Sequence, residues 1–512
     1  MSGAIAHGRE HRGPLRIDTD VVIVGSGAGG AVVAAECAAA GLSVVVLEEG
    51  PHVAAVDYGR MRPSEHMRRL WRDGGMSFAV GVGDTPMINV AMGRGVGGSS
   101  VLTGGVCFRV PGEIAHTWVH ERGLTDLSEE KLEPLYEEVE EIVHVEEVPA
   151  SMRSEGVRRF EQGAEKMGYA LKPLRRNTKG CNGCGMCNFG CPHQAKLSVD
   201  LTFLPRAVRD GARIVSDCRV DRVVVKGGRA VGVRGRLLNR GEGRRGRPGD
   251  EVHVTARRVV VSAGAWHTPL LLKRSGLGRR GGPLGRHLTL HPSFRMMARF
   301  DEPIRGWQGA LQSAYSDAFQ SEGITLVSLF VPPGVIAATM PGFGEQYVGR
   351  AKHIPHIAVF GGLIHDQGGG TVRRVPGREP LVTYRMAKQD RARIPRVIRL
   401  MAETFFAAGA AECFLPVLGL HAQTADDLAK LDLEHLPGRR FECASQHPLG
   451  SCRMGVDDRS GAVDDTGRFW GIDHLYVADG SVVPTSLGVN PQLTVMTMAL
   501  RIARRMLEGV RH

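Results

Sequence analysis

Hydrophobic and polar positions follow a recognisable order from the first domain onward. Residues 20–25 (DVVIVG) form a short β-branched run, typical of a strand buried within a parallel sheet. Small residues at 31–40 then favour a helix packed closely on that sheet and ended by Gly41. A second apolar run at 43–48 (SVVVLE) completes a predicted βαβ unit.

The rest of the chain predicts more strands than helices. Loops and short helices are expected at 51–92, and an acidic helix is expected at 127–147. Strands are predicted at 220–225, 230–233, 252–254, 258–263, 325–330, 357–363, 381–384 and 475–477, and helices at 394–408 and from 491 onward. The succession of short predicted strands followed by a helix between residues 298 and 436 indicates a separate sheet-and-helix domain. We therefore expect an α/β protein of two or more domains.

Composition indicates a globular protein and argues against a nucleic-acid partner. Of 512 residues, 42% are hydrophobic, which is enough for large buried cores. The formal charge of +11 rests on 65 basic residues, of which only 10 are Lys. The Arg residues are scattered, and their densest stretch (234–247) is interrupted by Gly and lacks aromatic residues, so we predict a solvated loop and no nucleic-acid partner.

The N-terminal 20 residues contain no apolar core of signal-peptide length, and no later stretch holds 18 consecutive apolar residues. Neither secretion nor a membrane span is therefore predicted. The chain has 10 Cys, four of them in one short segment. This usage favours a reducing compartment over a disulfide framework, and we expect a cytoplasmic location.

A phosphate-binding turn is predicted between the first strand and helix. Gly25, Gly27 and Gly30 have GxGxxG spacing, which allows a tight turn, close approach of a pyrophosphate, and close packing of helix on strand. Ala28 lies within the same turn. Glu48 follows the second strand, where a carboxylate can accept hydrogen bonds from ribose hydroxyls. The alternative is a Gly-rich turn with only a structural role.

Three further segments carry a family resemblance. They are 93–100 (GRGVGGSS), 264–278 (GAWHTPLLLKRSGLG), and 445–455 (SQHPLGSCRMG) with its continuation at 476–503. Together with the βαβ unit, in this order, they resemble the glucose–methanol–choline (GMC) family of FAD-dependent oxidoreductases. The resemblance extends from residue 20 to residue 503. It implies a discontinuous Rossmann-like FAD-binding domain and an α+β substrate domain built on an antiparallel sheet.

The resemblance also implies a division of the chain into five parts. FAD-binding segments are expected at 15–110, 201–295 and 439–512, the last with the catalytic residues. Residues 111–200 are expected to form a lid or linker containing the Cys-rich segment, and 296–438 the substrate-binding domain.

Individual residues receive roles from the same resemblance. His447 and Asn490 match the catalytic pair of the family. The matching cofactor-binding residues, beyond the glycine turn and Glu48, are Gly97, Gly98, Ser99, Ser100, Val220, Asp479, Gly480, Asn490 and Pro491. The chain departs from the family at Thr103, where Asn or His is usual. It also has Leu102 where some members carry a His that binds FAD covalently, so we expect non-covalent FAD.

The catalytic assignment suits alcohol oxidation. Imidazole is the natural base near neutral pH, so His447 can take the hydroxyl proton while a hydride leaves for the flavin N5. Asn490 can donate a hydrogen bond to the developing alkoxide. Pro491 suits the first turn of a helix whose N-terminus would face the flavin, although Asn490 could simply cap that helix. His291 is interpreted as structural.

The segment with Cys181, Cys184, Cys187 and Cys191 reads C-x2-C-x2-C-x3-C-P, the spacing of bacterial ferredoxins. An iron–sulfur cluster, a zinc ion and plain thiols are all compatible with it.

The leading hypothesis is a GMC-type alcohol oxidase or dehydrogenase, nearest the branch that acts on long-chain or sterol-like alcohols. It would pass electrons to oxygen or to a redox protein. An apolar run at 327–340 is compatible with an oily pocket or with core. The alternative is a flavin and iron–sulfur electron-transfer subunit without alcohol chemistry of its own.

Overall fold

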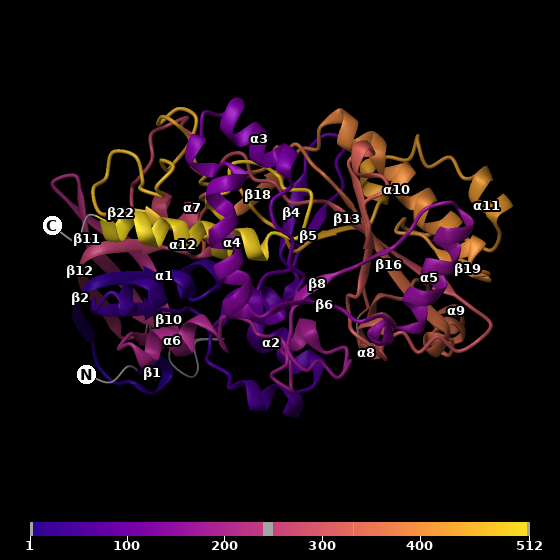
Figure 1. The fold of residues 1–512 in the computed structure, drawn as a ribbon, viewed down its shortest axis with the longest axis horizontal. Helices are drawn as coiled ribbons and strands as arrows, with labels where there is room; N and C mark the ends of the chain where they lie inside the picture. Colours follow the sequence, from indigo (N-terminus) through magenta and orange to yellow (C-terminus); the bar gives the residue numbers. More distant parts are fainter. Residues whose placement is uncertain (1–3, 239–248, 331, 509–512) are drawn as a thin grey trace.

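The computed structural model describes residues 4–238, 249–330 and 332–508. The larger part of the Arg-rich stretch, residues 239–248, lies outside the described residues. Two halves lie side by side, each built around one sheet (Figure 1). In the parts of the chain that the structure describes, no helix is both long and apolar enough to cross a membrane.

The first sheet assembles eight strands from distant parts of the chain. Their order is β1-β9-β3-β2-β12-β11-β10, and β22 also pairs with β12. The strands are β1 (Ala4–His7), β2 (Leu15–Val24), β3 (Val44–Leu47), β9 (Arg213–Ser216), β10 (Cys218–Lys226), β11 (Arg229–Leu237), β12 (Glu251–Val261) and β22 (Leu475–Val477). The central strand β2 runs parallel to both β3 and β12. This topology is that of a discontinuous Rossmann-like unit.

Burial on both faces explains the apolar runs of this sheet. Residues 21–24 of β2 and all of β3 are buried because helices cover both faces. Helix α1 (Ala28–Ala39) packs against α6 (Phe203–Arg209) and α12 (Gln492–Glu508), while α7 (Gly264–Arg274) packs against β10. Both described ends of the chain lie in this half (Figure 1).

The second sheet is mainly antiparallel and forms the core of the other half. Its strands are β4 (Phe78–Gly81), β5 (Ile88–Val90), β7 (Lys172–Pro173), β13 (Ser293–Arg299), β14 (Ala314–Ser316), β15 (Ile324–Ser328), β16 (Ile357–Ile364), β17 (Thr371–Arg373), β18 (Leu381–Tyr384), β19 (Glu412–Phe414), β20 (His421–Ala422) and β21 (Cys443–Ser445). The long helix α10 (Lys388–Ala407) lies on β13 and β16, beside α5 (Glu155–Lys166). Two strands, β4 and β5, come from the stretch predicted to hold only loops and short helices.

The remaining helices surround these two sheets. They are α2 (Pro63–Leu70), α3 (Gly112–His120), α4 (Glu129–Val143), α8 (Pro333–Thr339), α9 (Gly344–Ala351) and α11 (Ala425–Lys430). A small two-stranded sheet joins β6 (Val145–Glu147) to β8 (Arg175–Asn177). It holds the segment before the Cys-rich stretch against the end of α4.

The α/β class predicted from the sequence is confirmed, and two further elements differ locally from their predicted bounds. The strands expected at 252–254 and 258–263 form the single strand β12, because parallel pairing with β2 continues past the polar residues between them. Helix α10 begins at Lys388, six residues before its apolar periodicity starts. Pro395 lies inside it without ending it, because α10 packs along the second sheet on both sides of that residue.

Candidate functional site

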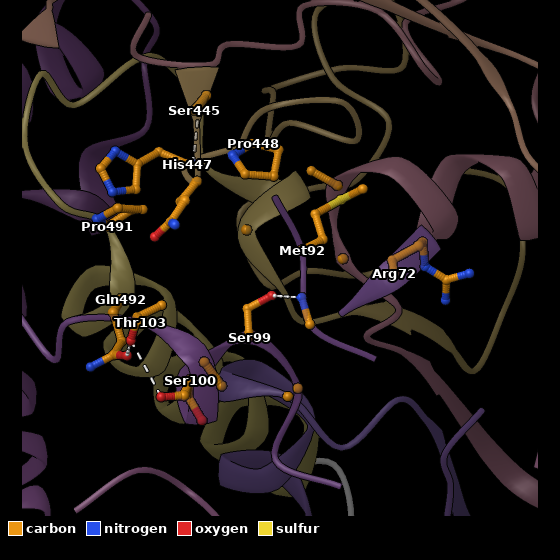
Figure 2. A pocket seen from close by; sticks show the side chains of 18 of the residues that line it. Arg72, Met92, Ser99, Ser100, Thr103, Ser445, His447, Pro448, Pro491 and Gln492 are labelled. Atoms are coloured by element: carbon orange, nitrogen blue, oxygen red, sulfur yellow. Dashed lines mark hydrogen bonds between the residues drawn. The ribbon is translucent and has the colours of Figure 1, made fainter. Parts of the chain in front are cut away.

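A cavity of about 650 Å³ receives residues from both sheets. Figure 2 shows His447 and Pro491 at one end of it, Arg72 at the other, and Ser99 and Ser100 along one wall. The following predicted residues line it: Gly25, Gly27, Ala28, Glu48, Gly98, Ser99, Ser100, Val220, His447, Asp479, Gly480, Asn490 and Pro491. Tertiary structure thus gathers segments that are far apart in the sequence. Gly30 and Gly97 support this wall from behind and do not line it.

The glycine turn is shaped by close backbone approaches. Gly25 has a φ of +97°, a conformation that favours glycine. A Cβ on Gly30 would lie 2.0 Å from the Gly25 carbonyl oxygen, so helix α1 can approach β2 only without a side chain there. A Cβ on Gly98 would lie 2.7 Å from the Gly27 Cα. The N-terminus of α1 has no side-chain cap and faces the cavity through Gly27 and Ala28, as an anion-binding turn requires.

Glu48 lies at the end of β3 and fixes the turn from the opposite side. One carboxylate oxygen accepts hydrogen bonds from the Ser26 amide at 3.0 Å and the Ser26 hydroxyl at 2.7 Å, and the other accepts from the Gly50 amide at 2.8 Å. Burial raises the pKa of Glu48, and these hydrogen bonds oppose that rise. Ser26 also accepts from the Gly97 amide at 3.2 Å, so the glycine turn and the 93–100 loop are joined.

The 93–100 loop is held by its serines. Ser99 accepts a hydrogen bond from the Gly93 amide at 2.9 Å, and Ser100 donates to the Gly97 carbonyl at 2.7 Å. Thr103, the departure from the family pattern, donates to the Gln492 side chain at 2.9 Å at the start of α12 (Figure 2). The hydroxyl therefore links this loop to the start of α12.

Asp479 closes the cavity from the last segment of the chain. It accepts hydrogen bonds from the amides of Gly264 and Ser481, each at 2.8 Å, and from the hydroxyls of Thr268 and Ser481. Burial raises its pKa and these donors oppose the rise. The arrangement ties the N-terminus of α7 to the segment that carries Gly480.

One charged network at the far end of the cavity escaped sequence reasoning. Arg72 pairs with Glu49 and with Glu379, at 3.2 Å for the latter, and Glu379 contacts His267 at 2.8 Å. Burial alone would raise the pKa of Glu49, but Arg72 and Arg94 lower it to about 2. Arg94 and His267 fall within the segments quoted above, at 93–100 and 264–278. No motif or periodicity links them to their charged partners, because those partners are more than 20 residues away in the sequence.

The two predicted catalytic residues meet at the other end. The Asn490 side-chain nitrogen lies 3.1 Å from His447 Nε2, across 43 residues of sequence. The Ser445 hydroxyl accepts from the His447 amide at 3.0 Å and so fixes the start of this segment. With the Asn490 amide as donor, Nε2 carries the lone pair and is free of a proton.

Burial controls the protonation state of His447. Its removal from water, with a smaller contribution from the neighbouring His291, lowers the pKa of His447 to about 3. The imidazole is therefore neutral across the physiological range and can accept a proton.

His291 holds the segment that leads to Asn490. Its Nε2 accepts hydrogen bonds from the amides of Leu487 and Gly488, at 3.0 and 3.2 Å. Asp366 accepts from the His291 amide at 3.1 Å and from the Ser486 hydroxyl at 2.8 Å. These contacts set the position of the turn that ends in Asn490.

Helix α12 begins one residue later than the sequence suggests. It starts at Gln492, and the Pro491 carbonyl accepts a hydrogen bond from the Val495 amide at 2.9 Å. The Asn490 side chain is directed to His447 and contacts its imidazole.

The Cys-rich segment is organised by two buried cations. Arg176 donates to Cys187 Sγ at 2.9 Å and to the Gly104 carbonyl at 2.7 Å. Lys196 donates to three carbonyls, those of Val101, Thr103 and Cys187. Burial raises the pKa of the Cys187 thiol, but the two cations outweigh it and the net pKa is lowered.

No support for the iron–sulfur or zinc prediction comes from this arrangement. Among the described residues, no group of three or more Cys, His, Asp or Glu side chains is placed to hold a metal ion. Cys181, Cys184, Cys187 and Cys191 are free thiols, and Cys187 is taken by Arg176. The iron–sulfur and zinc readings of the spacing therefore stay unsupported, and the arrangement is compatible with plain thiols.

The apolar run at 327–340 serves two roles. Val327, Leu329 and Thr339 line the cavity, whereas Phe330, Ile336 and Met340 belong to a small core cluster beneath the sheet. Both expectations for this stretch thus hold for different residues.

Comparison with known proteins identifies the family. Residues 19–293 and 370–499 match the N-terminal and C-terminal models of the GMC oxidoreductase family. An uncharacterised GMC-type oxidoreductase of Mycobacterium tuberculosis is 39% identical over 488 residues, covering 94% of this chain and 75% of the relative. A long-chain-alcohol oxidase of Arabidopsis thaliana is 29% identical, covering 97% of this chain and 68% of the relative.

Solved structures show the same fold. Pyridoxine 4-oxidase from Mesorbium loti matches with a TM-score of 0.71 at 19% identity, over 96% of this chain and 99% of that one. A variant of formate oxidase from Aspergillus oryzae RIB40 matches with a TM-score of 0.73 at 16% identity, over 98% of this chain and 100% of that one. The resemblance drawn from the motifs is confirmed, and the chain belongs to the GMC oxidoreductase family of FAD-dependent oxidoreductases.

Proposed function

We propose that this protein oxidises an alcohol to an aldehyde or ketone, with His447 as base and Asn490 as hydrogen-bond donor. The observation that carries the proposal is the 3.1 Å contact between Asn490 and His447 Nε2 at the cavity wall. A neutral base and an amide donor converge there on one point. A hydroxyl placed at that point would meet both groups that alcohol oxidation needs.

The residues that line the cavity are suited to hold FAD. The uncapped N-terminus of α1 and the glycines at 25, 27 and 98 offer backbone donors and space for a pyrophosphate. Glu48 and Val220 line the adjoining part of the cavity, and Asp479 with Gly480 the part leading toward His447. We assign these residues to holding the cofactor. FAD, when bound, supplies the hydride acceptor.

The protein's own groups then handle the proton. His447 Nε2 accepts the hydroxyl proton, and its low pKa keeps that position vacant at neutral pH. Asn490 donates to the oxygen as negative charge develops on it. Ser445 and His291 hold the two catalytic segments in place and keep their separation constant.

We infer that FAD is bound without a covalent link. The position of the linking His found in some family members is Leu102, whose side chain is buried in an apolar cluster with Val101 and Tyr58. Leu102 has no nucleophilic atom. We also infer that the electron acceptor is oxygen or a redox protein, and that the ten free cysteines reflect a cytoplasmic location.

An anaerobic alcohol panel tests the proposal. We expect the yellow protein to bleach with at least one alcohol, and FAD to be released on mild denaturation. The His447→Ala variant should keep its FAD and lose fast bleaching. Flavin that responds to no alcohol would refute the proposal and favour an electron-carrier role.

A further inference from the structure

Strands β13, β15 and β16 of the second sheet also line the cavity that contains His447. Its walls there are apolar, with Val106, Leu311, Val327 and Leu363 each almost fully buried. Leu329 extends the same wall. Such a lining suits a hydrocarbon chain attached to the reacting carbinol.

A single arginine interrupts this apolar wall. Arg295 lies on β13 and lines the cavity, opposite Gly361 of β16 in the strand register. The absence of a side chain at Gly361 makes room for Leu329, whose Cδ2 would lie 2.5 Å from a Cβ at that position. Arg295 Nε is buried without a hydrogen-bond partner, and none of its nitrogens forms a hydrogen bond or ion pair with another described residue.

The nearest acid is a poor counterion for Arg295. Extending the Ser293–Ala444 pairing by two residues places Glu442 across from Arg295, and Glu442 also lines the cavity. The two side chains form no ion pair among the described residues. Burial raises the pKa of Glu442, and Arg295 opposes this only in part. Burial likewise lowers the pKa of Arg295.

Arg295 as a whole is half-buried, but its Nε is shielded from solvent without a hydrogen-bond partner, and such a group is costly unless a ligand completes it. We propose that Arg295 binds the carboxylate of a hydroxy-acid substrate whose carbinol is oxidised at His447. The inference rests on the proposed function and names its substrate class. A carboxylate can take two parallel hydrogen bonds from one guanidinium, while the methylene chain lies along the apolar wall.

The fold limits the length of this substrate. Glu442, across from Arg295, precedes His447 by five residues, so their Cα atoms are at most about 18 Å apart along an extended chain. Arg295 and His447 both line the same cavity, and their side chains shorten the distance that a substrate must span between them. We therefore expect an ω-hydroxy acid of intermediate length, and 6-hydroxyhexanoate and 12-hydroxydodecanoate are the probes that bracket it.

Anaerobic stopped-flow flavin reduction separates anchoring from chemistry. Each hydroxy acid is compared with the n-alkanol of the same chain length, and apparent Kd and limiting reduction rate are measured. The wild-type protein should bind the better-fitting hydroxy acid at least tenfold more tightly than its alkanol. Arg295→Leu should weaken hydroxy-acid binding by about ten- to a hundred-fold and abolish the preference, with most of the change in Kd. Arg295→Lys should restore part of it.

Arg439→Leu serves as the matched control, since Arg439 is exposed on the same half of the molecule, outside the cavity. Equal Kd values for hydroxy acids and alkanols in the wild type would overturn the proposal. An equal loss on both substrates in Arg295→Leu would overturn it as well.

A binding measurement on the wild-type holoenzyme keeps the test independent of variant folding and of turnover. Hexanoate should perturb the flavin absorption spectrum on titration, whereas hexanamide should not. If hexanoate binds but no alcohol or hydroxy acid reduces the flavin, the proposed alcohol oxidation fails and the carboxylate site stands. If alcohols reduce the flavin but hexanoate binds no better than hexanamide, the carboxylate site fails and alcohol oxidation stands.

Discussion

A double-mutant cycle on His447 and Asn490 tests the chemistry at its centre. The two side chains are 3.1 Å apart and are proposed to contact the same substrate oxygen, one as base and one as donor. Replacing each by Ala, singly and together, removes these groups without touching the glycine turn, Glu48 or Asp479. All three variants should therefore retain FAD.

The expected magnitudes follow from the roles. Loss of a general base costs about a hundred- to ten-thousand-fold in rate, and loss of one oxyanion donor about a hundred- to a thousand-fold. Independent effects would multiply. Because Asn490 also hydrogen-bonds the base, the His447→Ala change already removes part of the contribution of Asn490 to the rate. The double variant should fall short of the product by about two- to 160-fold, since directly contacting residues couple by about 0.5–3 kcal/mol.

Stopped-flow flavin reduction, with an alcohol that reduces the wild type, measures the cycle. The pKa of about 3 for His447 adds a second observable: reduction should be independent of pH down to about pH 5, whereas an unperturbed imidazole would lose activity below about 6.5. The exposed His435→Ala is the matched control. Rapid reduction in His447→Ala with FAD bound, or strictly multiplicative effects in the cycle, would refute the reasoning.

Three further predictions concern stability and the cofactor. Gly30→Ala should lower both the FAD content and the Tm, because its Cβ would lie 2.0 Å from the Gly25 carbonyl oxygen. The control Gly349→Ala meets no atom within 4 Å and should be neutral. Equal FAD-to-protein ratios in the two variants would contradict this prediction. Lys196→Met leaves three carbonyls without their donor, so it should lower the free energy of unfolding in urea by at least about 2 kcal/mol. The exposed control Lys179→Met should have no effect, and equal unfolding midpoints for the two variants would disprove the prediction. Burial lowers the pKa of His291 to about 3. Its contribution to the free energy of unfolding is therefore full above pH 6.5 and is lost as pH falls toward 3, by about 1.4 kcal/mol per pH unit. His291→Asn should flatten this dependence of stability on pH in denaturant titrations, and an unchanged slope would count against the prediction.

The sequence by itself determined the parts of the protein that depend on local pattern. The β-branched run of β2, the glycine turn and the small residues of α1 specify a strand–turn–helix unit through neighbours only a few residues away. The segments around Ser99, His447 and Asp479 carried the family resemblance, because each is a compact motif. Even the fold class followed, since parallel strands buried on both faces read as continuous apolar runs.

Only the tertiary structure decided how these parts meet. Sequence spacing does not reveal that the Asn490 amide lies 3.1 Å from the His447 imidazole, because the contact depends on how the two segments pack. The spacing of the cysteines around Cys187 does not reveal that buried Arg176, from strand β8, donates a hydrogen bond to that thiol. Arg295 belongs to no motif, and its guanidinium becomes notable only because the folded sheet surrounds it with apolar walls. Local pattern predicts which elements form but not always where they end, as β12 and α10 show. Charge and catalytic geometry depend on burial and on distant partners, which exist only once the chain has folded.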